Sequence, residues 1–471
     1  MWKTIEKSKT SIFAPDSTTS FMLKFPEREL AGWGRFPREN CRVARAEKGR
    51  ELREVAQNAP VPTLIARGLG RSYGDAALNL DAGVVLLEKL NRFLDFDEQN
   101  GILNAEAGAS FASIAETFTS RGWFLPVVPG TKWITLGGAI AADVHGKNHH
   151  IDGSLSQFIE SFELILASGE TLSCSRTENS EAFWVTLGGM GLTGIIASAK
   201  LQLMPIESAF VRVSQRQTRD LDETLALLSS DEGFKYSVAW IDCLSSGAEM
   251  GRSIVLRGNH ALASEIEGAP FEEVSASRRK KVPLDFPDFA LTPFTVRAFN
   301  AAYYAAHPNG DEIQTFETFF WPLDVISDWN RIYGARGFVQ YQCVLPFETA
   351  RDGLKSLLEK ISASNRAAFL GVLKKYGASD EAPLGFAMPG YGLALDLPAT
   401  PEVRDFAQQL DEITLRFGGR VYLAKDAALS PQSARKMYPR IGEFERIKAQ
   451  LDPGGRFQSS LSKRLEIGTS L

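Results

Sequence analysis

The stretch RGLGRSYGD, residues 67–75, follows directly on the apolar run VPTLIA at 61–66. Three glycines, two arginines and an aspartate take up six of its nine positions. A strand that ends in Gly68 and Gly70 exposes consecutive backbone N–H groups, because glycine tolerates positive φ and lets a ligand approach the chain closely. A phosphate fits such a nest, and a structural tight turn explains the same residues equally well.

The turn does not match the Rossmann fingerprint that its glycines first suggest. GLGRSYGD has no third glycine at the required spacing, and no helical pattern follows it. The next regular element is predicted to be a strand, GVVLL at 83–87. A phosphate bound here would therefore belong to another kind of nucleotide site.

Two further glycine-rich segments follow in the same part of the chain. PGTKWITLGGAIAADVHGKNHH, residues 129–150, carries three of the five histidines of the chain within its last six positions. LGGMGLTGI, residues 187–195, leads into an alternating strand. Three loops that expose their backbone cost conformational entropy unless something large and flat lies against them. A dinucleotide with a pyrophosphate and a planar ring fits that description.

Length and composition restrict the class of protein. A chain of 471 residues is expected to form two domains, since single domains usually hold about 100 to 200 residues. With 44% hydrophobic residues it is typical of a globular protein, and no apolar run approaches the roughly 18 residues of a membrane span. A net charge of −5 gives no general basic field for nucleic acid, and the four cysteines include no C-x-x-C pair. The N-terminus lacks the apolar core of a secretory signal, which predicts a cytoplasmic protein.

The pattern of apolar residues predicts an α+β fold. Five strands are expected within 61–204, and Ser110 is a candidate N-cap for a helix among them. After residue 337 the order strand, helix, strand, strand, helix, strand predicts an antiparallel sheet backed by helices. The strands are expected at 337–345, 369–377, 390–398 and 420–424, and the helices at 347–361 and 401–417. Each helix has one apolar stripe, so the helices cover one side of the sheet and leave the other side to face something else.

The three glycine-rich segments together resemble the FAD-binding half of the vanillyl-alcohol-oxidase-type, or PCMH-type, flavoproteins. HGKNHH, FVQYQ, VLKKYG, YLAKD and DPGGRFQSSLSKRL extend the resemblance, across most of the chain, to the decaprenylphosphoryl-ribose 2-oxidase family. The resemblance implies an FAD-dependent oxidoreductase that oxidises the 2-hydroxyl of a lipid-linked ribose to a ketone by hydride transfer to flavin N5. It also implies a separate NAD(P)-dependent reductase partner that completes epimerisation to arabinose for the cell wall. Peripheral contact with the inner membrane, through the region 264–330, is left open.

The resemblance further implies an FAD-binding domain at 1–204 made of two α/β subdomains, a substrate or cap domain at 205–415, and a C-terminal segment at 416–471 that returns to the FAD domain. Many relatives attach the flavin through a histidine just after the second glycine of the first turn. Arg71 stands at that position and forms no such bond, so non-covalent FAD is expected. The residues that the resemblance assigns to FAD are Arg67, Gly68, Leu69, Gly70, Arg71, Ser72, Tyr73, Gly74, Pro129, Gly130, Thr131, Thr135, Gly137, Gly138, Ala141, Val144, His145, Gly146, Asn148, Gly191, Gly194, Ile195 and Tyr422.

The sheet face that the helices leave free is expected to roof the flavin and to bind the sugar phosphate. The resemblance assigns catalytic roles to Lys425, beside the reacting hydroxyl, and to His145, beside the isoalloxazine ring. Judged from the residues alone, Lys425 is a solvated cation at a strand end, and Gln340 and Gln342 are the solvated face of a strand. No metal is required, and the histidines of HGKNHH lack the carboxylate or thiol partners of a zinc site. The residues assigned to the substrate are Lys147, Phe320, Gln340, Gln342, Lys374, Tyr376, Gly392 and Ala394.

Three positions depart from the best-known members of the family, which carry an asparagine, a cysteine and a tyrosine where this chain has Gly392, Ala394 and Phe320. The two smaller side chains on the strand 390–398 predict a roomier, less polar pocket and put the identity of the sugar in doubt. Two alternatives stay open. One is a sugar-alcohol or aldonolactone oxidase of the same flavin fold that passes electrons to oxygen, and the other is a flavin-binding protein without turnover.

Overall fold

The glycine turn leaves the edge strand of a four-stranded sheet in the computed structural model, which describes residues 23–468 apart from 231–232, 269, 272–279, 288–289, 365, 367–369 and 380. The sheet has the order β1-β2-β4-β3, in which β4 runs parallel to both neighbours and β1 antiparallel to β2. Its strands are β1 (Glu27–Ala31), β2 (Arg38–Arg45), β3 (Leu64–Arg67) and β4 (Gly83–Leu86), and α1 (Gly49–Asn58) joins β2 to β3. The element after the turn is thus a strand, as predicted. The N-terminal residues behind the prediction about a secretory signal lie outside the described part.

The other two glycine-rich segments lie beside a second, five-stranded antiparallel sheet. Its order is β5-β6-β10-β8-β9, and α3 packs against β10 and β6. The hydroxyl of Ser110 accepts a hydrogen bond from the Ser113 N–H, so the predicted N-cap is confirmed. The strands are β5 (Phe93–Asp97), β6 (Ile102–Glu106), β8 (Ile159–Ile165), β9 (Thr171–Ser175) and β10 (Ile195–Gln202), with β7 (Trp123–Phe124) and β11 (Met204–Pro205) forming a separate pair. The helices are α2 (Phe111–Phe118), α3 (Leu136–Ala141), α4 (His149–Asp152) and α5 (Ser180–Thr186).

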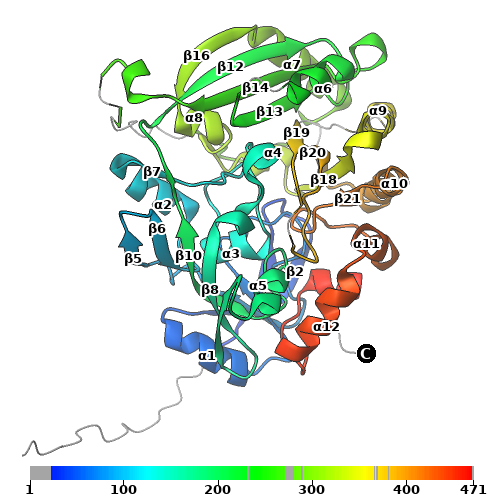
Figure 1. Ribbon diagram of the computed structural model, residues 1–471. Coiled ribbons are helices and arrows are strands. Elements are labelled where there is room, and N and C mark those ends of the chain that lie inside the picture. The colour runs from blue at the N-terminus through cyan, green and yellow to red at the C-terminus, as the bar shows by residue number, and fades with distance from the viewer. Residues whose placement is uncertain are drawn as a thin grey trace, which may run out of the picture.

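A third sheet of eight antiparallel strands runs from the top of the molecule, where β16 and β12 lie, down to β18 and β21 at the right in Figure 1. Its order is β16-β12-β14-β13-β19-β20-β18-β21. The strands are β12 (Phe210–Thr218), β13 (Tyr236–Ile241), β14 (Ser253–His260), β16 (Gly310–Thr315), β18 (Phe338–Pro346), β19 (Gly371–Tyr376), β20 (Gly390–Pro398) and β21 (Arg420–Val421). The helices of this region are α6 (Leu221–Ser229), α7 (Pro293–Ala306), α8 (Phe316–Phe320), α9 (Phe347–Ala363) and α10 (Val403–Arg416), and the short strands β15 (Lys280–Lys281) and β17 (Ile326–Ser327) pair beside them.

The predicted antiparallel sheet backed by helices is confirmed. Helices α9 and α10 pack on β18 through the apolar stripes seen in the sequence, which include Leu354, Leu357, Phe406 and Leu410. The last strand is shorter than predicted, because β21 ends at Val421 and the chain then turns, with the Lys425 N–H donating to the Tyr422 carbonyl at 2.9 Å. That turn places the 422–426 segment beside the free face of the sheet rather than in it.

The C-terminal segment returns to the first sheet. It contains α11 (Pro431–Met437), α12 (Ile441–Leu451) and α13 (Ser460–Leu465), and its last helices lie at the lower right of Figure 1. Arg464 donates to Asp75, the last residue of the glycine turn, at 2.8 Å, and to Asp426 at the same distance. These contacts brace the turn, while the division into domains that the resemblance implies stays a prediction. In the described residues we find no helix with both the length and the apolar character needed to span a bilayer.

Candidate active site

The glycine turn is wedged between two other parts of the chain. Gly70 has a φ of 67°, which favours glycine. A Cβ added at Gly74 would overlap the backbone carbonyl oxygen of Asp426, and one added at Gly68 would overlap the hydroxyl of Thr135. Close approach, rather than flexibility, thus requires glycine at these two positions. The turn lies against the start of α3 on one side and against the segment after β21 on the other.

The other two glycine-rich segments close around α3. The hydroxyl of Thr135 caps the helix by accepting from the Gly138 N–H at 3.3 Å. The third segment joins the same helix, because the Met190 N–H donates to the Ala141 carbonyl at 2.8 Å. Apart from the two chain neighbours of Gly130, no atom of the described residues lies within 4 Å of the point where its Cβ would be, so this loop leaves open space beside its backbone. The structure therefore brings all three segments together.

His145 is the buried polar group at the end of the second segment. Its ring lies between three aromatic side chains, with centroids 5.1 to 5.3 Å from those of Tyr376, Phe386 and Tyr422. Its Nε2 lies 2.8 Å from the amide nitrogen of Gln342, whereas its Nδ1 has no hydrogen-bond partner in the described residues. Burial, and then the charge of Lys374, hold the pKa of His145 well below its usual range, so the ring is neutral at pH 7.

FAD fits this arrangement. Open backbone beside glycine suits a pyrophosphate, and a buried ring nitrogen without a protein partner suits a hydrogen bond to a bound molecule. The free face of the eight-stranded sheet lies over the same place, because Gln342 on β18 reaches His145 from it. The site is thus closed by loops on one side and by a sheet on the other.

The predicted substrate residues of β18, β19 and β20 share that free face. Gln342 also donates to the Tyr376 hydroxyl at 3.2 Å, and both side chains are buried, so the solvated reading of the glutamines is wrong. Lys374 pairs across strands with Gly392, and Ala394 pairs with Gln342. A Cβ on Gly392 would overlap the Tyr376 ring. The space expected from the missing side chain at Gly392 is therefore partly filled by this tyrosine.

Lys425 lies over an aromatic ring beside this face. Its Nζ is 3.6 Å from the ring centroid of Tyr73, which is itself buried. Burial lowers the pKa of Lys425 to about 7, an effect that the charge of Asp396 partly offsets. The solvated reading of this lysine is therefore wrong as well.

Asp396 is the residue that the sequence analysis missed. It is fully buried on β20, accepts from the Gln340 amide at 2.6 Å and from the Tyr333 hydroxyl at 3.2 Å, and faces Lys425. Burial raises the pKa of its carboxyl to about 7. The available signal was its position, because alternation along β20 puts Asp396 on the same face as Gly392 and Ala394.

Two predicted substrate residues, Lys147 and Phe320, lie at the end of α8, and their contact with a substrate stays a prediction. Burial, and then the charge of nearby Lys374, lower the pKa of Lys147 to about 7. The Lys147 ammonium donates to the carbonyls of Phe319 and Phe320 at 2.7 and 3.1 Å, so backbone at the end of α8 already binds it. Phe320 packs into a buried aromatic cluster with Phe124 and Tyr236. These two residues contact each other rather than Lys425.

Several residues predicted to contact FAD are engaged by the protein. Arg67 donates to the carbonyls of Ala31 and Ala77, and the Arg71 guanidinium stacks 3.9 Å from the ring centroid of Trp33. The same holds for Thr131, which binds Asp324, for Asn148, which binds Asp152 and the Pro126 carbonyl, and for Tyr422, which donates to the Ala142 carbonyl at 2.7 Å. The others lie along the three segments and at the start of β10: Leu69, Ser72, Pro129, Gly137, Ala141, Val144, Gly146, Gly191, Gly194 and Ile195.

Comparison with known proteins agrees with this geometry. Residues 41–175 match the model of an FAD binding domain, and residues 344–465 match that of D-arabinono-1,4-lactone oxidase. The chain is 36% identical to decaprenylphosphoryl-beta-D-ribose oxidase of Mycolicibacterium smegmatis, over 96% of this chain and 100% of that protein. It is 26% identical to L-gulonolactone oxidase of Scyliorhinus torazame, over 87% and 91%, and 22% identical to L-gulono-1,4-lactone dehydrogenase of Mycobacterium tuberculosis, over 92% and 98%. The predicted FAD cofactor and α+β flavoprotein fold are confirmed.

Proposed function

Because the chain belongs to the decaprenylphosphoryl-β-D-ribose oxidase family, and so is an FAD-dependent oxidoreductase acting on a sugar hydroxyl, we propose that it oxidises the 2-hydroxyl of a lipid-linked ribose to a ketone. One observation carries the assignment of roles. His145 from a glycine-rich loop meets Gln342 of the sheet, with Lys374 and Lys425 facing the same place. This supports a single site in which a cofactor and a phosphorylated sugar lie side by side.

When bound, FAD supplies the acceptor of the hydride from the sugar carbon. The three glycine-rich segments would hold it through their backbone, and the sheet face would exclude water from the reacting atoms. The protein must then take up the proton of the hydroxyl.

Lys425 is the residue that we assign to this proton. With its pKa lowered to about 7 by burial, the free amine is well populated at neutral pH, and Nζ can accept the proton. The ammonium that results lies over the face of Tyr73 and opposite Asp396, and both stabilise a positive charge.

His145 holds a proton at a defined atom. An amide nitrogen only donates, so the Gln342 amide fixes Nε2 of His145 as the acceptor and leaves the proton on Nδ1. This N–H is directed to a bound molecule, since the described residues offer it no acceptor. His145 thus orients an oxygen of the substrate or cofactor.

Lys374 is suited to the phosphate of the substrate. Its ammonium forms no hydrogen bond or ion pair with another described residue, and burial lowers its pKa to about 8. A phosphate beside it would favour the charged form.

The test is anaerobic reduction of the flavin, followed by its absorbance in a stopped-flow instrument. Prenyl-phosphoryl ribose is expected to bleach the flavin rapidly, whereas free polyols and aldonolactones are not. If every prenyl-phosphoryl sugar leaves the flavin oxidised, the proposed substrate is wrong.

An aldonolactone oxidase is the second candidate, favoured by the D-arabinono-1,4-lactone oxidase match at 344–465. It would reduce oxygen, so rapid peroxide formation with free aldonolactones would support it. The same stopped-flow series therefore separates the two functions.

Non-covalent binding of FAD belongs to the same proposal. The residue at the attachment position is Arg71, whose guanidinium stacks on Trp33 and has no nucleophilic ring nitrogen to offer. Denaturation with acid should release all of the flavin into the supernatant. Flavin that stays on the precipitated chain would contradict this.

A partner reductase and a membrane surface complete the proposal. The ketone must be reduced to invert the carbon, and a nicotinamide-dependent reductase can supply that hydride. The enzyme would also have to bind a lipid-linked substrate at the membrane surface, where the head group is exposed. A coupled assay with such a reductase should convert the ribose lipid to the arabinose lipid.

A further inference from the structure

Helix α7 exposes an apolar surface. Its sequence, PFTVRAFNAAYYAA, contains one charged residue, and of its side chains those of Val296 and Asn300 are buried. Phe294 is 80% exposed. Monomeric proteins seldom leave contiguous apolar surface of this kind in water unless it binds something.

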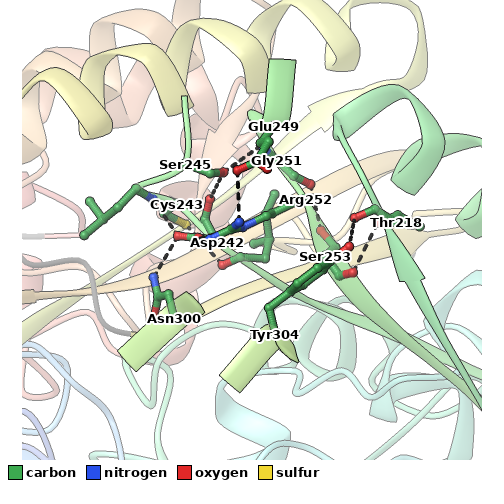
Figure 2. A network of polar contacts seen from close by, with 12 residues as sticks. Thr218, Asp242, Cys243, Ser245, Glu249, Gly251, Arg252, Ser253, Asn300 and Tyr304 are labelled. Carbon is green, nitrogen blue, oxygen red and sulfur yellow. Dashed lines mark hydrogen bonds and ion pairs between the residues drawn. The ribbon is translucent and has the colours of Figure 1, made fainter. Parts of the chain in front are cut away.

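The opposite side of α7 is fixed to the sheet by polar contacts, which Figure 2 shows. Asn300 donates to Asp242 at 2.7 Å, and Arg252 holds the other carboxylate oxygen of Asp242 at 2.9 Å. The Tyr304 hydroxyl donates to the Thr218 carbonyl at 3.1 Å. These contacts set the rotation of the helix, so its outer side, with Phe294, Ala298, Ala301 and Ala305 at helical spacing, remains exposed.

The segment before α7 adds apolar and basic side chains. Leu284 is 75% exposed and Phe286 is 42% exposed. Lys280 and Lys281 are exposed on β15, and Lys281 also lies 3.5 Å from Asp328. Exposed apolar side chains flanked by lysine or arginine are typical of surfaces that insert at the interface of an anionic bilayer.

This surface borders the candidate active site. Tyr303 of α7 packs against Trp240, with ring centroids 4.9 Å apart. Trp240 pairs across strands with Val372, and alternation puts Lys374 on the same sheet face. On the other side, Leu291 packs against the aromatic cluster that includes Tyr73.

We propose that the outer side of α7, with Leu284 and Phe286, is a docking face for an anionic lipid bilayer, flanked by Lys280, Lys281 and Arg297. The idea rests on the proposed function, because a lipid-linked substrate would reach the site from such a bilayer. Charge favours this occupant over a second copy of the chain. The nearby acids Asp285 and Asp328 are paired with Arg35 and Lys281, so Lys280 and Arg297 remain to attract an anionic surface and to repel an identical copy. Docking here would bring the head groups close to the sheet face that carries Lys374.

The experiment measures binding of the full-length holoenzyme to vesicles by sedimentation. Vesicles of phosphatidylcholine with phosphatidylglycerol should bind the protein, and vesicles of phosphatidylcholine alone or high salt should weaken binding. Phe294→Asp should lower the partition coefficient roughly tenfold or more, because burial of one large apolar side chain is worth about that factor. Leu94→Asp is the matched control, since Leu94 is 47% exposed on β5, and it should bind like the wild type.

Flavin absorbance of both variants reports whether they fold, and light scattering reports their mass. Equal binding of Phe294→Asp and wild type, or no binding of the wild type, would overturn the proposal. So would a wild-type dimer that Phe294→Asp converts to a monomer, because the face would then belong to a second copy. Vesicle binding needs no substrate, so the stopped-flow test of the proposed function can fail while this one succeeds, or the reverse.

Discussion

The two sides of the candidate site differ in the groups that they present to a ligand, which are backbone groups on one side and side chains on the other. The loop side uses backbone, with Gly68 and Gly74 so close to their neighbours that a methyl group would overlap them. The sheet side uses side chains, with Asp396 and Lys374 on the free face and Lys425 beside it, and burial shifts the pKa of all three. A backbone site is specified by the absence of side chains, whereas a side-chain site is specified by burial that shifts pKa values. Substitutions on the loop side should therefore act through steric overlap. Substitutions on the sheet side should act by changing the charges and pKa values of the reacting groups.

The largest expected effect belongs to the sheet side. Lys425→Met should slow anaerobic flavin reduction by about 10²- to 10⁴-fold, the usual contribution of a positioned acid or base, while the protein keeps its flavin. Lys436→Met, an exposed lysine on α11, is the control and should reduce at the wild-type rate. A Lys425→Met enzyme with normal reduction kinetics would remove the lysine from the mechanism.

On the loop side, Gly74→Ala and Gly130→Ala should behave differently. Gly74→Ala forces a methyl group onto the Asp426 carbonyl and should destabilise the apoprotein by about 1–3 kcal/mol, measured by thermal unfolding. Gly130→Ala enters open space, so it should leave the stability of the apoprotein unchanged and weaken FAD binding, measured by flavin fluorescence. Equal effects on stability would contradict the distinction between a packing role for Gly74 and a ligand-binding role for Gly130.

Gly392 shows that the sheet side also contains a glycine required by close approach, because its missing side chain makes room for the Tyr376 ring. Gly392→Ala should cost about 1–2 kcal/mol of stability by overpacking, and the same change should cost less when Tyr376 is already alanine. The four unfolding free energies of this double-mutant cycle measure the coupling. Identical costs in both backgrounds would show that the ring is not the obstacle.

The smallest expected effect is a shift of the pH profile. The amine form of Lys425 grows as pH rises through its pKa of about 7, so the reduction rate should rise with pH through that value and level off above it. The negative charge of Asp396 raises the pKa of Lys425, so Asp396→Asn should move the profile toward lower pH. A shift toward higher pH would contradict the assigned coupling.

The same contrast explains how far the sequence could be read. Glycine spacing and apolar alternation predicted the strand after the turn, the helix cap at Ser110 and β20 to the residue, because these depend on local geometry. Alternation put Asp396 on the face of Gly392 and Ala394, but its burial depends on Gln340 and Tyr333, which lie far from it in the sequence. Lys147 shows a second limit, since its position in HGKNHH gave no sign that its ammonium would bind the carbonyls of Phe319 and Phe320. Contacts between residues far apart in the sequence determine the surroundings of both side chains.

The ion pair between Asp75 and Arg464 joins residues 389 positions apart. During synthesis the glycine turn emerges early, yet the residue that braces it is made only after the entire sheet region. Closing so long a loop is slow compared with local folding. The ion pair that braces the glycine turn can therefore form only after translation has passed Arg464.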